Sequence, residues 1–149
     1  MRIEEEIKQT KFRSPYQKAG INLIYTANWL QNQQKDFFRQ FRITGQQFNI
    51  LRILKGQHPR SISVTDIKTR MLDKNSDVSR LLDRLTLKSL ISRKVCSYDK
   101  RSMDVFITEQ GIELLEKIEL QVSQLDRFMG KLSIEEASQL SNLLDKVRD

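Results

Sequence analysis

The 149-residue chain has little of several residue types, and each shortage narrows what the protein can be. A single cysteine, Cys96, excludes an internal disulfide and a structural zinc site built on several thiolates. Only five glycines and two prolines argue against a loop-rich β architecture. The one histidine, His58, has no second ligand at metal-site spacing, so we expect neither a metal centre nor a cofactor.

Long apolar runs are also missing. No segment approaches the roughly 18 apolar residues that a membrane span needs. The first eleven residues are charged and lack the apolar centre of a secretory signal. We therefore expect a cytoplasmic protein with no membrane partner. The sequence also offers no Ser/His/Asp set and no glycine-rich phosphate loop, so an enzyme is not expected.

Positive charge is in excess. The formal net charge is +7, from 26 basic and 19 acidic residues. Such a balance favours a polyanionic partner, and nucleic acid before a membrane. Between residues 74 and 101, eight basic residues against three acidic ones leave +5, so most of the excess lies in less than a third of the chain.

Capping signals and apolar spacing predict a mainly α protein with a small β-hairpin. Helices are expected to begin at five hydroxyl residues that precede amphipathic segments: Ser14, Thr44, Ser63, Thr108 and Ser133. The first should run to about residue 41, and the helix after Thr108 should continue unbroken to about residue 129. Another amphipathic helix is predicted from about residue 76 to 88. Alternating runs at 91–97 and 103–107, joined by a polar connector, predict the hairpin.

The middle of this order is a short helix, a turn, an amphipathic helix and a hairpin, which are the elements of a winged helix-turn-helix. In that motif the second helix enters the major groove, where base edges carry a readable pattern of donors and acceptors. Five polar residues of this region are candidates for DNA contact: Asn75, Ser76, Ser79, Arg80 and Arg84. Ser76, Arg80 and Arg84 are four residues apart and should lie along one side of the helix. The other interpretation is a charged face that is merely solvated.

Residues 44–111 resemble the multiple-antibiotic-resistance regulator (MarR) family of bacterial transcription factors. The resemblance is carried by SRLLDRL at 79–85, LISR at 90–93, DKR at 99–101 and ITEQG at 107–111. Its most specific part is the D-x-R pattern, followed seven residues after the arginine by T-x-x-G. One departure is Ser89, which stands where the family usually has glycine. Because a non-glycine residue prefers negative φ, we expect a slightly different turn there.

The resemblance implies a single domain over residues 1–149, in which the helical regions 14–43 and 109–148 of two copies interlock as a homodimer. Residues 44–108 would form the winged-helix lobe. Asp99, Lys100 and Arg101 would form the wing tip, with Asp99 orienting Arg101 into a minor groove whose potential attracts arginine.

The implied function is a sequence-specific transcription regulator, with a repressor favoured, that binds a pseudo-palindromic operator in double-stranded DNA. The family also often binds a small-molecule effector. The alternative is a winged-helix module that contacts an acidic protein and not DNA.

Four residues carry more than one interpretation. Tyr25 and Trp29 either line an effector pocket or belong to the dimer core, and the core is favoured. Asp77 caps the helix, accepts from a cytosine amino group or repels phosphate, and capping is favoured. Cys96 is interpreted as a small strand residue and not as an oxidant sensor.

Overall fold

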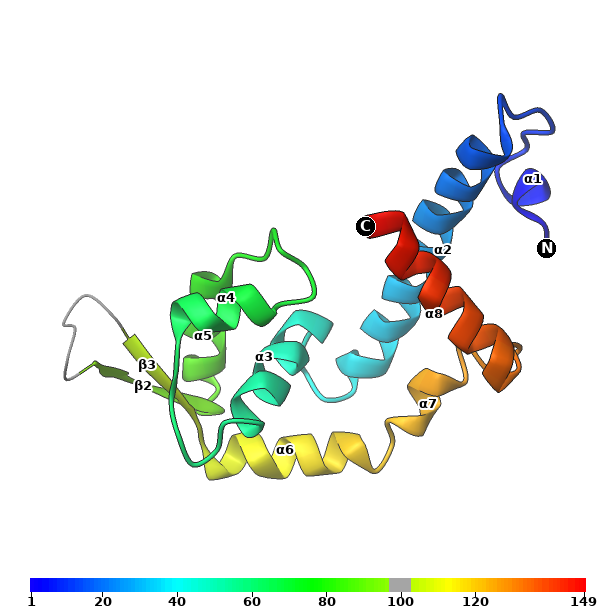
Figure 1. Cartoon of the computed structure of the whole chain (residues 1–149). Helices are drawn as coiled ribbons and strands as arrows, with labels where there is room; N and C mark the ends of the chain where they lie inside the picture. Colours follow the sequence, from blue (N-terminus) through cyan, green and yellow to red (C-terminus); the bar gives the residue numbers. More distant parts are fainter. Residues whose placement is uncertain (97–102) are drawn as a thin grey trace.

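The computed structural model describes residues 1–96 and 103–149, and it confirms a mainly α fold with a small antiparallel sheet (Figure 1). The helices are α1 (Ile3–Glu6), α2 (Pro15–Arg39), α3 (Gly45–Lys55), α4 (Val64–Arg70), α5 (Val78–Leu87), α6 (Glu109–Glu119), α7 (Ser123–Asp126) and α8 (Ile134–Arg148). The strands are β1 (Ile62–Ser63), β2 (Ile91–Val95) and β3 (Met103–Ile107).

Side-chain caps begin five helices where the sequence predicts them. In each case a hydroxyl accepts a hydrogen bond from the backbone N–H three residues later, at 3.0–3.2 Å. The capping residues are Ser14, Thr44, Ser63, Thr108 and Ser133. Each cap satisfies an amide that the helix leaves unpaired, which stabilises a helix end by about 1 kcal/mol. Local sequence therefore fixes these boundaries.

Strands β2 and β3 form the predicted hairpin, with Ile91 opposite Ile107. The short strand β1 adds a third member, because Ile62 pairs with Val105 on the free side of β3. The strand order is β1-β3-β2, and both pairs are antiparallel. The sheet thus ties the start of α4 to the hairpin that follows α5.

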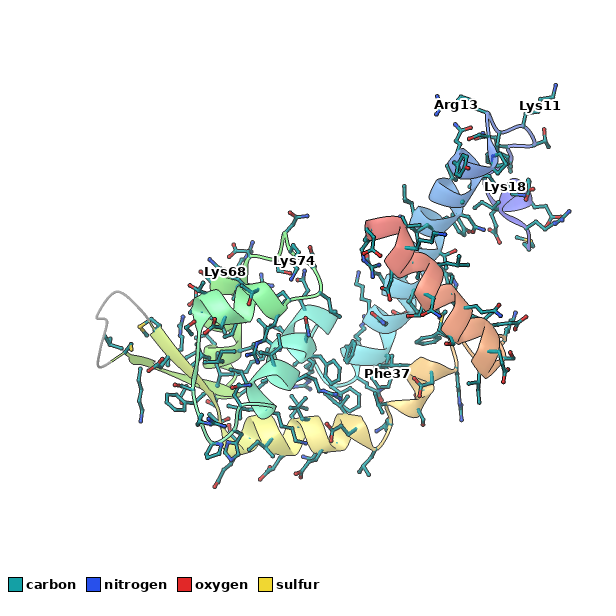
Figure 2. All side chains as sticks on the ribbon, viewed as in Figure 1. Lys11, Arg13, Lys18, Phe37, Lys68 and Lys74 are labelled. Carbon is teal, nitrogen blue, oxygen red and sulfur yellow. The ribbon has the colours of Figure 1, made fainter. Side chains whose placement is uncertain are left out.

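The core lies among α3, α4, α5, α6 and the sheet. Its least exposed side chains are Ile50, Leu51, Leu54, Ile67, Met71, Val78, Leu82, Leu85, Val105, Leu115 and Ile118. Phe37 and Phe38, near the end of α2, extend this core, and Figure 2 labels Phe37 at that junction. The rest of α2 and all of α8 stand outside it, as Figure 1 shows.

The helix expected to run unbroken from Thr108 to residue 129 is interrupted, so that expectation is wrong. Helix α6 ends at Glu119, and α7 covers only Ser123–Asp126. In the connection, backbone N–H groups bond to carbonyls three residues back, as in a 3₁₀ turn. The physical reason is packing: Ile118 is buried, but Leu120 is exposed, and none of the four described side chains of α7 is buried. Beyond Ile118 the chain's own core offers little to hold a regular helix.

Ser89 adopts the backbone conformation of a glycine, so the expectation of a different turn is also wrong. Its φ is +56°. The N–H groups of Ser89 and Leu90 donate to the carbonyls of Thr86 at 2.9 Å and Leu85 at 3.1 Å, which closes α5 as a Schellman motif. The Thr108 hydroxyl donates to the Ser89 carbonyl at 2.7 Å. These hydrogen bonds override the local preference of serine.

Ser89→Gly is expected to raise the free energy of unfolding by about 1 kcal/mol, because a left-handed residue with a Cβ costs roughly 1–2 kcal/mol. Denaturant titration of the full chain measures the change. Ser89→Ala keeps the Cβ and should stay within about 0.5 kcal/mol of the wild type. A less stable Ser89→Gly protein would mean that the serine side chain contributes more than its backbone conformation costs.

Candidate nucleic-acid interface

Helix α5 has two opposite faces. Its apolar face packs into the core through four buried side chains: Val78, Leu81, Leu82 and Leu85. Its other face is exposed and carries Ser79, Arg80, Asp83 and Arg84. Because the apolar side is fixed in the core, the polar side has one orientation and projects outward. Three of the five predicted DNA-contacting residues of this region therefore share one exposed helix face.

The other two candidates lie outside the helix, which begins later than predicted. Asp77 is the N-cap, and its Oδ1 accepts the backbone N–H of Arg80 at 3.1 Å. The capping interpretation of Asp77 is thereby confirmed. Asn75 and Ser76 belong to the preceding turn, so Ser76 does not continue the line of arginines along α5. The cap sits at Asp77 because Val78, the first helical residue, must enter the core.

The only acid on α5 is paired with a cation of the hairpin. Asp83 Oδ1 lies 2.8 Å from Arg93 Nη1, and Arg93 is on β2. The two side chains are 62% and 29% exposed, so the pair stabilises the fold by about 1 kcal/mol at most. Its larger effect is electrostatic, because it offsets the negative charge of Asp83 on the face that carries Arg80 and Arg84.

The predicted wing tip, Asp99, Lys100 and Arg101, lies outside the described residues. The strands that lead into it and out of it are β2 and β3. Near the end of the hairpin that leads into the tip, Lys94 pairs with Asp104 across the strands, and its Nζ lies 5.5 Å from the centre of the Phe106 ring. The role of the tip stays a prediction. Cys96 directly follows β2, which ends at Val95, so the prediction that it is a strand residue is wrong; its thiol is free and half-buried.

Cations near the start of α5 are not among the five residues that the sequence predicts to contact DNA, although Lys74 belongs to the basic stretch 74–101. Lys68 and Arg70, in the last turn of α4, are exposed, and so is Lys74 in the turn that follows. Figure 2 shows Lys68 and Lys74 on the same side of the molecule. The signal was available, because the first helix of a helix-turn-helix crosses the nucleic-acid backbone and its exposed cations lie near phosphates.

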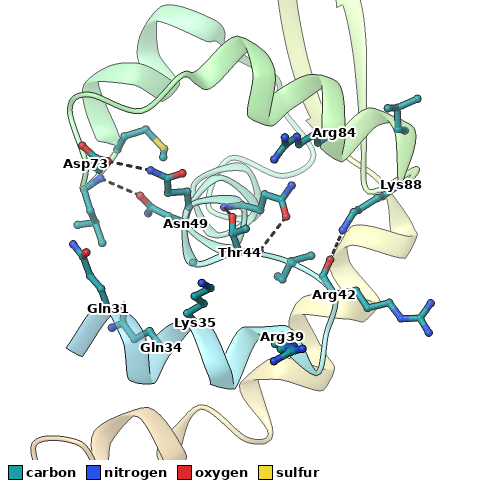
Figure 3. Close-up of a pocket in the computed structure, with 17 residues that line it drawn as sticks. Gln31, Gln34, Lys35, Arg39, Arg42, Thr44, Asn49, Asp73, Arg84 and Lys88 are labelled. Atoms are coloured by element: carbon teal, nitrogen blue, oxygen red, sulfur yellow. Dashed lines mark hydrogen bonds between the residues drawn. The ribbon is translucent and has the colours of Figure 1, made fainter. Parts of the chain in front are cut away.

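A cleft of about 1160 Å³ opens between the second half of α2, the start of α3 and the end of α5 (Figure 3). Its charged lining residues are Lys35, Arg39, Arg42, Asp73, Arg84 and Lys88. Its apolar lining residues are Ile43, Met71, Leu72 and Leu87. Five cations and one acid give the cleft a positive potential beside an apolar surface.

The cleft and the exposed face of α5 share residues. Arg84 lines the cleft and also belongs to the polar face of α5. Lys88, just after α5, donates through Nζ to the backbone carbonyl of Arg42 in the connection between α2 and α3. A molecule in the cleft would therefore contact the same helix that presents Arg80 to solvent.

Tyr25 and Trp29 line neither this cleft nor the smaller one, of about 400 Å³, between α2 and α7. The hydroxyl of Tyr25 donates to Glu6 Oε2 at 2.6 Å, and this hydrogen bond raises the pKa of Tyr25 above its ordinary value. Trp29 packs edge to face against Phe128, with ring centroids 6.3 Å apart. The cleft could not be predicted from the sequence, because its lining residues come from three stretches, 31–49, 71–73 and 84–88, that meet only in the fold.

The described residues were also compared with the requirements of a membrane span and of a metal site. Within residues 1–96 and 103–149, no helix combines the length and the apolar character needed to cross a bilayer. Among the same residues, no three histidine, cysteine or acidic side chains gather as a metal ion would require.

Comparisons with known proteins agree with this geometry. The model of the MarR family matches residues 43–103. The HTH-type transcriptional repressor MdtR of Bacillus subtilis (strain 168) is 29% identical over 119 residues, which are 79% of this chain and 76% of that protein.

Two solved structures are also similar. A MarR transcription factor from Planctomyces limnophilus is 31% identical with a TM-score of 0.71, over 91% of this chain and 98% of that one. MepR of S. aureus, solved in complex with DNA, is 25% identical with a TM-score of 0.76, over 92% and 97% of the two chains.

Proposed function

Because the chain belongs to the MarR family of winged-helix transcription regulators, we propose that it binds double-stranded DNA as a homodimer and represses transcription from a pseudo-palindromic operator. The observation that carries this proposal is α5, whose apolar face is locked in the core while Ser79, Arg80 and Arg84 project outward. Two relatives support it: MdtR is described as a repressor, and MepR was solved bound to DNA.

In this proposal α5 lies in the major groove, which is wide enough for a helix. Arg80, in the first turn, reads a base edge, because its guanidinium can donate two hydrogen bonds to a guanine. Arg84, one turn later, contacts a base or a phosphate. Asp99, Lys100 and Arg101 contact the adjacent minor groove, and Lys68 and Lys74 approach phosphates.

The proposed dimer forms through the two ends of the chain, residues 14–43 and 109–148. Within these regions α2 and α8 expose large apolar side chains: Leu23, Ile24, Tyr25, Trp29, Ile134, Leu140, Leu143 and Val147. Monomeric proteins rarely leave apolar patches of this kind in water. Pairing two copies would bury them and present two α5 helices to one duplex, with half-sites about one helical turn apart.

The proposed effector binds in the cleft and not beside Tyr25 and Trp29. The lining of the cleft suits a small molecule that has an apolar body and a negative charge. Such a molecule would release DNA only if it binds the DNA-free arrangement more tightly than the bound one. Arg84 provides the physical connection, because a charge held in the cleft competes with DNA for this guanidinium.

Arg80→Ala tests the function. The variant loses one bidentate base contact in each half-site, so operator binding should weaken by about 1–3 kcal/mol per half-site, or roughly 5–150-fold for each, and the base preference should relax at one position of each half-site. Selection of bound fragments from a random DNA pool defines the operator, and fluorescence anisotropy at fixed salt measures the affinity.

Arg13→Ala is the matched control, since it removes one exposed arginine side chain that lies before α2, outside residues 14–43 and 109–148 and far from α5 (Figure 2). It should bind the operator like the wild type. If wild-type protein fails to bind mixed genomic DNA at ~50 mM salt, the DNA-binding proposal is wrong and the acidic-protein alternative is favoured. If only Arg80→Ala binds unchanged, α5 is not the reading element.

A further inference from the structure

The turn between α4 and α5 is held from α3 by two side-chain amides. Gln46 Nε2 donates to Asp73 Oδ2 at 3.0 Å and to Ser76 Oγ at 3.2 Å. Asn49 Oδ1 accepts the backbone N–H of Leu72 at 3.0 Å. Figure 3 shows Asp73 and Asn49 facing each other at one end of the cleft. We call Gln46 and Asn49 the α3 amides.

Inside the turn, hydrogen bonds centre on Asp73. Its Oδ1 accepts the N–H of Asn75 at 2.9 Å, and its carbonyl accepts the N–H of Ser76 at 3.2 Å. These bonds give the turn its shape but do not attach it to the rest of the protein. The second carboxylate oxygen of Asp73 makes that attachment through Gln46.

Apolar packing anchors the turn only at its ends. Met71 and Val78 are buried, whereas Leu72 is 88% exposed. Residues 72–77 therefore lack a buried apolar side chain. Lys74 Nζ donates to the Thr69 carbonyl of α4, and the hydrogen bonds to the α3 amides set how the turn lies against α3. Without them, two buried ends would still hold the chain, but the segment between them would be less constrained.

The position of this turn sets the position of the first turn of α5. Ser76, which accepts from Gln46, directly precedes the N-cap Asp77. Asp77 in turn binds the N–H of Arg80. A shift of the turn would move the cap, and with it the exposed Ser79 and Arg80.

We propose that the α3 amides are positioning residues for DNA recognition: they hold residues 72–77 so that the first turn of α5 keeps its DNA-reading orientation. This inference rests on the proposed function, because it assigns Gln46 and Asn49 a role in the same DNA contact. Both amides, together with Asp73, also line the cleft. The residues that position α5 are therefore within reach of a molecule bound there.

Gln46→Ala should lower operator affinity about tenfold, or by about 1.4 kcal/mol, because the first turn of α5 is then held less firmly in its DNA-reading orientation. Its affinity for non-operator DNA at the same salt should change less than about twofold, because the phosphate-contacting cations are kept. Hydrogen exchange should become faster at the amides of residues 72–80 and stay unchanged in α6. Gln57→Ala is the control, since it shortens a glutamine just after the other end of α3, outside the cleft and outside the proposed dimer regions.

A rescue separates positioning from general damage to the fold. Gln46→Glu places a carboxylate against Asp73 and should bind the operator at least as weakly as Gln46→Ala. The double variant Gln46→Glu/Asp73→Asn reverses the direction of the hydrogen bond and should restore affinity to within about threefold of the wild type.

The outcomes distinguish the inference from the function on which it rests. If the wild type binds no DNA, the proposed function fails, and the exchange rates at residues 72–80 still decide whether Gln46 holds the turn. If the wild type binds its operator and Gln46→Ala matches Gln57→Ala in both affinity and exchange, the positioning role is wrong. A double variant as weak as Gln46→Glu would also overturn it.

Discussion

Replacing Leu143 with glutamate should leave the chain folded but monomeric, and its affinity for the full operator should fall by about 100-fold or more. Leu140, Leu143 and Val147 form one stripe of α8 and are 37%, 61% and 73% exposed. Helix α8 buries no side chain among the described residues, so a charge at Leu143 does not enter the core. It does enter the proposed dimer interface, where an unpaired carboxylate is strongly unfavourable.

The expected loss of affinity has a geometric origin. A dimer places two α5 helices on one duplex, so the second half-site is bound at a high effective concentration. A monomer keeps every contact within one half-site and loses only that advantage. A duplex with a single half-site should therefore bind the wild type and Leu143→Glu with similar affinity.

Asn142→Glu is the matched control, because this exposed residue lies on the side of α8 opposite Leu140 at 100° per residue and two turns away from Ile134. It adds the same charge to the same helix and should remain dimeric. Sedimentation velocity measures the oligomeric state, and anisotropy measures binding to both duplexes. A Leu143→Glu protein that still sediments as a dimer would place the interface elsewhere.

Local signals in the sequence were enough to predict most helices and the hairpin. A cap such as Ser14 or Thr44 satisfies an amide within three residues, and the apolar spacing that follows selects the buried face. The features that were missed depend on distant contacts. The break after Glu119 reflects the end of the core, and β1 forms only because Ile62 meets Val105.

Part of the candidate site could likewise be predicted from local sequence, and part of it depends on contacts between residues that are distant in the chain. The exposed face with Arg80 and Arg84 follows from the period of α5 alone, so the sequence predicted it. The α3 amides and the cleft could not be predicted, because Gln46 and Asp73 are 27 residues apart in the chain. The conformation at Ser89 was predicted wrongly, because hydrogen bonds in the turn outweigh the intrinsic preference of serine for negative φ. The wing residues Asp99, Lys100 and Arg101 stay a prediction.

Gly111→Ala should lower the free energy of unfolding by about 3 kcal/mol, at the upper end of typical overpacking costs. A Cβ added at Gly111 would lie 2.3 Å from the carbonyl oxygen of Leu90 and 2.8 Å from Cγ1 of Ile107. The Leu90 carbonyl cannot retreat easily, because it accepts the N–H of Thr108 at 3.1 Å. Relief of the clash would therefore disturb both the start of β2 and the cap of α6.

The T-x-x-G part of the family resemblance thus has a structural explanation within the described residues. Thr108 caps α6 through the N–H of Gly111 at 3.1 Å and bonds to the carbonyl of Ser89 at 2.7 Å, while Gly111 permits the close approach of Leu90. These contacts join the end of α5, the first strand of the hairpin and α6. Gly111→Ala should consequently weaken DNA binding only as far as it unfolds the chain.

Gly20→Ala makes the same chemical change in a helix with open surroundings, since no atom lies within 4 Å of the added methyl. It should raise the free energy of unfolding by up to about 1 kcal/mol through helix propensity. Thermal melting should show a fall of roughly 6–12 °C for Gly111→Ala and a small rise for Gly20→Ala. If the two variants shift the melting temperature in opposite directions, the destabilisation of Gly111→Ala comes from the contact with Leu90 and not from the added methyl group itself. If Gly111→Ala melts at the same temperature as the wild type, the hairpin and α6 can move apart without cost, and the close contact between Gly111 and Leu90 does not stabilise the fold.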